Sequence, residues 1–546
     1  MMVFMVGMLA FAIDLGYICT VDAQLDRAVD AAAIAGAGAL IEGTAAAQDR
    51  AVEYLVRNPV GGTIMMQDES QLEALKAEFL ARYGEDLDVT WGHWDSDTRT
   101  MEVSDQLPSA LTVSLTYSNM PLFFGKMLGT DSYNVTSQAT AIYQPRDIML
   151  VLDFSASMND DSELTAISTV GQETVEASLY QMWLDLDSPT YGNMSFTPEW
   201  VTIPGNSLSF DVTWKLTEVD VSAAQNMQQV RLYFDNGSTQ SFNISSKSGT
   251  WKGTGSKSGR RIDKVRVKIG GQYETVDFYN NSHVRRGLEL DGVDYPSQGD
   301  WDDYIEYARS SSSSMPWYDS AVYSAGYRGK FGFLTLVNHW NKNKPAYDQT
   351  PILWKVSAQP VTAVKNAVDV FMDYIRLVDV DDRVGLSVYN SSSGMGELES
   401  ELTLDLDFVS DAARHRQAGH YHDYTNIAAG MQKAREEFEA NGRVGARKMM
   451  VLMTDGNANW TPYGYNTNAA RNNVYDEAEL CAELKIPIVT ISLGAGADVA
   501  LMEDVAEITD GLHFNIPGGC TVDEYSEELM EVFRRIASAR PLLLVN

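Results

Sequence analysis

Hydrophobic and polar residues follow two kinds of spacing along this chain, helical in some segments and strand-like in others. After Pro345, amphipathic helical segments such as "PVTAVKNAVDVFMDYIRLV" alternate with short apolar segments such as "DRVGLSVYN", "RKMMVLMTDG" and "IPIVTISLG". Strands that alternate with helices at this spacing predict an α/β fold with a doubly wound, mostly parallel sheet. The apolar segment "DIMLVLD", which ends at Asp153, has the composition of a buried strand and supplies the first strand of this sheet.

A long interval separates that strand from the first helix of the α/β pattern. We therefore expect the α/β domain to comprise residues 146–158 and 359–546, with an insertion at 159–358. Within the insertion, short alternating segments between Gly, Asn and Ser turns predict six short strands of a β-sandwich over about 196–285. An aromatic-rich segment follows at about 300–355, for which packing against neighbouring elements is the preferred role. Because the insertion starts in the loop after Asp153, it is placed to cap, gate or extend a site at that strand end.

The first residues of the chain form an apolar segment. "MMVFMVGMLAFAIDLGYICTV", residues 1–21, is interrupted only by Asp14, and about 20 apolar residues are needed to span a bilayer. We therefore expect a single-pass transmembrane anchor here, with a signal peptide or a buried helix as alternatives. Residues 22–145 then predict an Ala-rich helix and a small α+β unit. Everything after the anchor is expected to be extracytoplasmic, either periplasmic or at the cell surface.

Charge narrows the range of partners. The 546-residue chain contains 41 Lys and Arg against 75 Asp and Glu, for a formal net charge of −34. A surface this acidic repels phosphate backbones, which excludes nucleic acid as a partner and favours divalent cations. The cysteines, Cys19, Cys481 and Cys520, are too sparse for a disulfide framework, although a Cys481–Cys520 pair stays open.

Oxygen-bearing side chains gather at one predicted edge of the α/β sheet. Ligands of such sheets lie at the carboxyl ends of the strands, and several candidate donors fall there. They are Asp153, Ser155 and Ser157 after the first strand, Thr425 before a helix leaving the same edge, and Asp455 after a later strand. Hydroxyls and carboxylates without nitrogen or sulfur suit Mg²⁺ first, or Mn²⁺ or Ca²⁺. Ser155 has no histidine base in evidence, so we do not expect an enzyme.

Two resemblances extend this interpretation. The motifs "DFSAS", "YTN" and "TDG", in this order, resemble the metal-ion-dependent adhesion site of von Willebrand factor A domains. This resemblance implies a bound divalent ion with one position open for a carboxylate of a protein partner. "FAIDLGYICTVDAQLDRAVDAAAIAGAGAL" resembles the N-terminus of TadG-like proteins of the Flp/Tad pilus-assembly system, which are single-span membrane proteins that often end in an A domain.

Together these observations predict a membrane-anchored, extracytoplasmic binding protein that engages a partner through a divalent ion, in Flp/Tad pilus assembly or adhesion. One alternative is a structural component of an envelope complex in which the ion only stabilises the fold. The other is a metal-dependent hydrolase, which would need a general base beside the ion.

Overall fold

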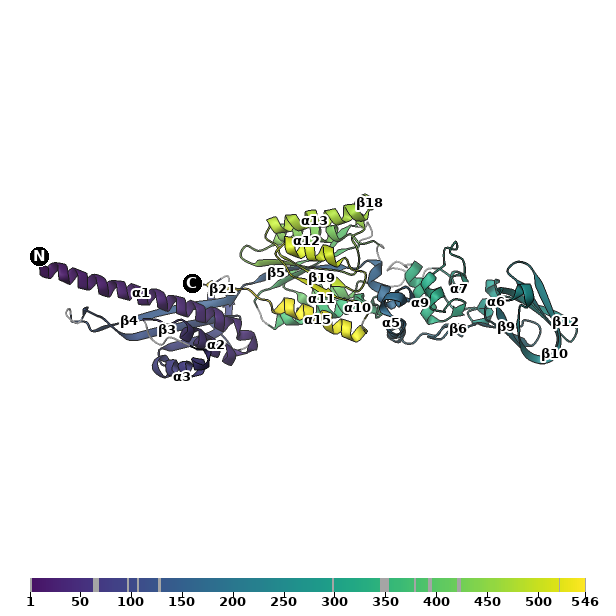
Figure 1. Ribbon diagram of the computed structural model, residues 1–546, viewed down its shortest axis with the longest axis horizontal. Coiled ribbons are helices and arrows are strands. Elements are labelled where there is room, and N and C mark those ends of the chain that lie inside the picture. The colour runs from purple at the N-terminus through teal and green to yellow at the C-terminus, as the bar shows by residue number, and fades with distance from the viewer. Residues whose placement is uncertain are drawn as a thin grey trace.

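Three units follow one another along the molecule (Figure 1): an N-terminal unit, a central α/β unit and the insertion at the opposite end. The structure is a computed structural model, and it describes residues 2–61, 68–95, 98–105, 108–125, 129–296, 299–343, 353–377, 380–390, 395–419, 424–519 and 521–545. Cys520 lies outside the described residues, and Cys481 is a buried thiol.

The N-terminal unit packs helices on one antiparallel sheet. Its strands run in the order β2-β1-β3-β4-β21, with bounds β1 (Leu87–Asp95), β2 (Thr100–Val103), β3 (Ala110–Pro121), β4 (Ser132–Tyr143) and β21 (Leu542–Val545). The helices are α1 (Met2–Gly38), α2 (Thr44–Arg57) and α3 (Leu72–Tyr83). The apolar segment and the Ala-rich segment thus form one continuous helix, α1, because no glycine–proline signal separates them. Val21, Leu25 and Val29 in the second half of α1 are buried in the hydrophobic core of the N-terminal unit.

The central unit is a mixed α/β sheet with helices on both faces. The strand order is β15-β14-β5-β16-β19-β20, and all pairs are parallel except β14 with β15. The strands are β5 (Arg146–Asp153), β14 (Arg383–Tyr389), β15 (Gly396–Thr403), β16 (Arg447–Thr454), β19 (Ile488–Leu493) and β20 (His513–Ile516). Every residue of β5 is buried. Alternate β5 side chains therefore face two cores, with Leu150 in one and Val151 in the other.

Each of these cores is closed by a different set of helices. The face of Leu150 is covered by α10 (Val361–Arg376), α11 (Leu406–Arg414) and α15 (Val522–Ser538). The face of Val151 is covered by α12 (Ile427–Asn441), α13 (Thr467–Glu483) and α14 (Val499–Ile508). The central unit is itself inserted into the N-terminal unit, because the chain leaves after β4 and returns with β21 to pair with β4.

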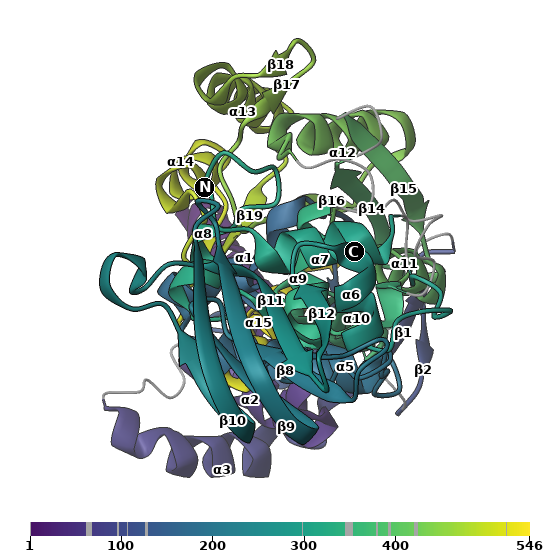
Figure 2. The same cartoon turned by 90° about the vertical axis from the view of Figure 1, so that its right-hand side faces the viewer.

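The insertion leaves the central unit immediately after β5. It begins with η4 (Ala156–Ser162), η5 (Leu164–Ala166), α4 (Ile167–Val170) and α5 (Gln172–Asp185). An antiparallel sheet follows, made of β7 (Thr202–Pro204), β8 (Phe210–Trp214), β9 (Glu218–Phe234), β10 (Thr239–Lys252), β11 (Ile262–Ile269) and β12 (Gln272–Asp277). The chain returns through α6 (Asn281–Gly287), α7 (Trp301–Arg309), α8 (Ser320–Ser324) and α9 (Phe333–Asn343). Figure 2, which views this end, shows strands β8 to β12 in front of the rest of the molecule.

Three details of the predicted insertion are wrong. Its strands β7 to β12 are hydrogen-bonded into one antiparallel sheet, instead of the two sheets of a β-sandwich. Segments expected as four separate short strands form two long ones, β9 and β10, which pair along their length with register shifts around Ser246. No glycine or proline lies between Val219 and Phe234, so nothing in that sequence ends the strand, and the irregularity is absorbed by a bulge. The helices of residues 164–185 were not predicted either, because their polar and apolar residues lack a clear helical period.

Candidate metal centre

The sheet register brings Asp153 and Asp455 to the same edge. Asp153 is the last residue of β5 and lies opposite Tyr389 of β14. On the other side of β5, β16 pairs in parallel and ends at Thr454, so Asp455 is the first residue beyond it. Because neighbouring parallel strands end at one edge, the two carboxylates approach each other from adjacent loops.

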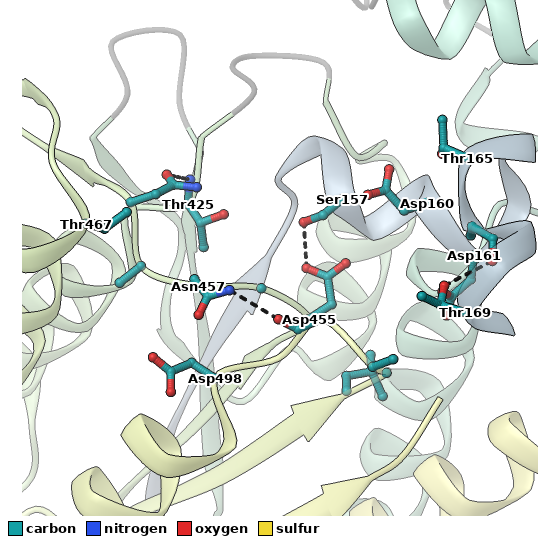
Figure 3. Close-up of a pocket in the computed structure, with 18 of the residues that line it drawn as sticks. Ser157, Asp160, Asp161, Thr165, Thr169, Thr425, Asp455, Asn457, Thr467 and Asp498 are labelled. Carbon is teal, nitrogen blue, oxygen red and sulfur yellow. Dashed lines mark hydrogen bonds between the residues drawn. The ribbon is translucent and has the colours of Figure 1, made fainter. Parts of the chain in front are cut away.

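Hydroxyl groups connect these two carboxylates. Oδ1 of Asp153 accepts a hydrogen bond from the Ser155 N–H at 2.8 Å, and its Oδ2 accepts one from the Thr454 hydroxyl at 2.8 Å. The Ser155 and Ser157 hydroxyl oxygens lie 2.9 Å apart. The Ser157 hydroxyl donates to Oδ1 of Asp455 at 2.7 Å (Figure 3). Four of the predicted ligands are therefore joined in one hydrogen-bonded chain.

Thr425 reaches the same place from the loop before α12. Its backbone N–H donates to Oδ1 of Asn459 at 2.7 Å, and the neighbouring Tyr424 ring stacks on Trp460 with centroids 4.3 Å apart. A Cβ added at Gly456 would lie 3.5 Å from the Ser157 hydroxyl oxygen and 3.7 Å from that of Thr425. Both hydroxyls thus lie beside the Gly456 backbone, and all five predicted residues meet at one edge of the sheet.

The site is buried and its negative charge is not balanced by basic side chains. Asp153 is fully buried and Asp455 is 7% exposed. Burial raises the pKa of Asp455 well above its usual range, and the nearby Asp153 carboxylate raises it further. Burial also raises the pKa of Asp153, against the opposing hydrogen bonds from Ser155 and Thr454. Across the described ranges, no Lys, Arg or His side chain forms an ion pair with either carboxylate.

A cavity of about 690 Å³ opens next to these residues (Figure 3). Ser157, Thr425 and Asp455 contribute to its wall. The first helical turns of the insertion form another part, through Asp160, Asp161, Thr165, Ala166 and Thr169. Arg471 and Asp498, which form an ion pair, line the cavity from α13 and from the start of α14. The cavity therefore lies between the central unit and the base of the insertion.

The donor set at this edge fits a hard cation. It consists of carboxylate and hydroxyl oxygens, which are ligands that Mg²⁺, Mn²⁺ and Ca²⁺ accept. In the part of the chain that the structure describes, no three His, Cys, Asp or Glu side chains cluster as a site of their own. A cation here would depend on the hydroxyls of Ser155, Ser157 and Thr425 in addition to the two carboxylates.

Sequence reasoning missed the residues that hold the ligands in place. Thr454 binds Asp153, Asn459 holds the Thr425 backbone, and Asp161 adds a half-buried carboxyl, whose pKa is raised by its partial burial. Thr454 had a usable signal, since it directly precedes Asp455 at the end of the same strand. Asn459 had none, because its position depends on how a loop folds back. Asp161 lies in the acidic segment "NDDSEL", residues 159–164, which could hold calcium but is more typical of a solvated turn.

Family comparisons agree with the class of fold that this sheet and strand edge define. A profile of the von Willebrand factor type A domain matches residues 354–520, and the chain contains an A domain. A second profile, described as Tad-like Flp pilus-assembly, matches residues 35–141. The protein therefore combines a Tad-like Flp pilus-assembly domain with a von Willebrand factor type A domain.

Solved structures with similarity to the chain match only part of it. An aerotolerance-related membrane protein from Bacteroides fragilis is 14% identical, with a TM-score of 0.25, and the match covers 33% of this chain and 90% of that one. A von Willebrand factor type A protein from Catenulispora acidiphila is 13% identical (TM-score 0.26; 33% and 37% covered). The pilus adhesin SpaC from Lactobacillus rhamnosus GG is 15% identical (TM-score 0.26; 32% and 28% covered). No curated protein matches the chain.

Proposed function

We propose that this protein is a membrane-anchored, extracytoplasmic binding protein of Flp/Tad-type pilus assembly or adhesion. Its A domain would bind a divalent cation, with Mg²⁺ as the first candidate, through Asp153, Ser155, Ser157, Thr425 and Asp455. The cation would supply positive charge for a carboxylate offered by a protein partner. The chain would act as a binding protein, without a catalytic step.

One observation carries this proposal: two uncompensated strand-end carboxylates are bridged by serine hydroxyls at the wall of an open cavity. Two buried carboxylates this close repel each other unless a proton or a cation lies between them. The cavity gives a partner access to that point, and it is lined in part by the insertion. The insertion would therefore contribute to the choice of partner.

A purely stabilising ion is the second candidate, and the depth of the site favours it. Asp153 and Ser155 are both fully buried, which is where a structural ion would be expected. Under this alternative, removal of the ion would lower the free energy of unfolding, but molecules that stay folded would keep their partner bound.

A photocrosslinking experiment separates these two candidates. A photoreactive amino acid at Tyr465, which lines the cavity, should give a crosslinked partner in cells with Mg²⁺ and lose it after chelation. The same amino acid at Val444, a fully exposed residue remote from the cavity, is the matched control. A Tyr465 crosslink that persists after chelation, in a protein shown by titration to bind Mg²⁺, would support the stabilising ion. Failure to bind any divalent ion would reject both.

A further inference from the structure

Asp14, the single charge in the apolar first half of α1, is held by a distant segment of the chain. Its Oδ1 accepts a hydrogen bond from the Phe123 N–H at 2.9 Å. The Phe124 N–H donates to Oδ1 at 3.2 Å and to Oδ2 at 3.0 Å. Phe123 and Phe124 follow β3, in the turn that leads to β4, and Asp14 itself is buried. The carboxylate therefore fastens the β3–β4 turn to α1.

The surface around this fastening point is apolar and exposed. Phe123 is 64% exposed, and its ring forms a T-shaped contact with that of Tyr17, with the ring centroids 5.0 Å apart. Phe124 is 37% exposed. On α1 itself, the large apolar side chains at this level and before it are also exposed, namely Met8, Leu9, Phe11, Ile13 and Leu15. Figure 1 shows the ends of β3 and β4 alongside this first half of α1.

The environment of α1 changes close to this level. From Val21 onward, one side of the helix is buried against the sheet and the other carries acidic residues such as Asp22 and Asp26. Before Asp14, exposed apolar residues lie on several sides of the helix. A helix that passes from apolar on several sides to amphipathic within about two turns has the pattern of a membrane boundary. Over residues 7–38, this helix is by length and composition long and apolar enough to cross a membrane.

We propose that Phe123 and Phe124, directly after β3, form a second membrane contact and insert into the lipid interface beside α1. The proposal rests on the membrane anchor of the proposed function. A bilayer is the occupant that fits, because the exposed phenylalanines are continuous with the exposed apolar part of α1 and aromatic side chains favour the interface. Asp14 then lies at the boundary with its charge bound by two amides, and the two contacts together fix the tilt of the N-terminal unit.

Depth-dependent quenching in vesicles tests this contact. An environment-sensitive dye would be attached at Phe123→Cys in the full chain, with Cys19 and Cys520 replaced by serine. The chain would be reconstituted into phosphatidylcholine–phosphatidylglycerol vesicles that contain a spin-labelled phosphatidylcholine. Dyes at Leu9→Cys and Phe408→Cys report the anchor and an exposed position on the central unit. We expect strong quenching at positions 9 and 123 and none at position 408.

Each of the other possible results would contradict the turn contact, the membrane anchor or the role of Asp14. Quenching at position 9, with position 123 no more quenched than position 408, would reject the turn contact and leave the anchor standing. An unquenched dye at position 9 would reject the anchor, and the turn contact with it. Asp14→Ala should at least halve quenching at position 123 and leave position 9 unchanged, whereas Asp22→Ala, which removes an exposed carboxylate of α1, should change neither. Unchanged quenching at position 123 in Asp14→Ala would show that Asp14 does not hold the turn.

Discussion

Asp153 and Thr425 differ in charge, and this difference sets the order in which their loss should weaken metal binding. Asp153→Ala removes one of two carboxylates and should reduce affinity for Mg²⁺ by roughly 100-fold or more. Thr425→Ala removes a neutral oxygen that water can partly replace, so a loss of about tenfold or less is expected. Isothermal titration of the full chain in detergent measures both constants.

Two pocket residues supply the controls for these variants. Asp498→Asn neutralises a carboxylate that pairs with Arg471, and Thr467→Ala removes a hydroxyl at the start of α13. Neither belongs to the hydrogen-bonded chain between Asp153 and Asp455, so both should keep the parental affinity. If Asp153→Ala binds Mg²⁺ as tightly as Asp498→Asn does, the strand-end residues are turn formers and the metal site is rejected.

Lys365 of α10 should make stability depend on pH. It is 4% exposed, and burial lowers its pKa to about 7, with a smaller contribution from Arg414. The unfolded chain, with a lysine pKa of about 10.4, binds more protons than the folded chain between about pH 7 and pH 10. Through this residue, the free energy of unfolding therefore rises with pH across that window and is lowest below it.

The variant Lys365→Met removes this contribution. Its free energy of unfolding should exceed that of the parent most at pH 7, and the difference should shrink toward pH 10. Denaturant melts at pH 7, 8.5 and 10 measure it, with exposed Lys485→Met as the matched control. A difference between parent and Lys365→Met that stays constant over these pH values would contradict the lowered pKa.

The ligand candidates could be chosen from the sequence because strand ends and residue chemistry are both visible there. "VLD" and "MTDG" each show an apolar strand that stops at an aspartate, and parallel pairing brings such ends together. Their use of a metal stays a prediction. Asp14 could not be interpreted in the same way, because its partners lie 109 and 110 residues later in a turn with no local signal.

At the scale of elements, apolar periodicity predicted which helices and strands exist better than it predicted how long they are. The alternation after Pro345 predicted an α/β sheet with helices on both faces, and the resemblance of the strand-end motifs predicted the A domain that the family match shows. In the insertion, strands β9 and β10 were each predicted as two short strands, because polar residues on an exposed strand face resemble turn residues in sequence. The pairing of β21 with β4 could not be predicted from the sequence, because the paired residues lie some 400 positions apart and no local pattern indicates their contact.

Strand β21 gives a prediction at this scale. Leu544 packs against the core of the N-terminal unit, whereas the adjacent Leu543 is 44% exposed. Leu544→Ala should lower the melting temperature of that unit by roughly 3–8 °C, and Leu543→Ala by much less. Scanning calorimetry of the full chain measures both variants, and neither should alter Mg²⁺ affinity. Equal losses for the two variants would mean that β21 does not contribute side chains to the core.

At the scale of the molecule, the cores do not follow the order of the chain. Buried apolar residues of the insertion and of one face of the central sheet form one continuous cluster, from Ile148 through Leu179 to Val265. The core on the other face of the sheet is tied to this cluster through the shared strand β5, every residue of which is buried. The N-terminal unit has a separate core, centred on α1 and its sheet. Shared cores unfold together and separate cores can unfold independently. The insertion should therefore behave as part of the A domain in an unfolding experiment, even though it projects from one end (Figure 1).

This division predicts two calorimetric transitions for the full chain, of which Mg²⁺ should shift only one. A ligand that binds the folded state alone stabilises it by about 2.7 kcal/mol at 100 times its Kd, and the proposed site lies wholly within the central unit and the base of the insertion. The transition that Leu544→Ala lowers should thus be insensitive to Mg²⁺, while the other rises. Asp153→Ala should abolish that rise without changing the number of transitions. If Mg²⁺ shifted both transitions, the N-terminal unit would unfold together with the central unit in spite of its separate core. If a third transition belonged to the insertion, the insertion would unfold on its own in spite of the core that it shares with the central unit.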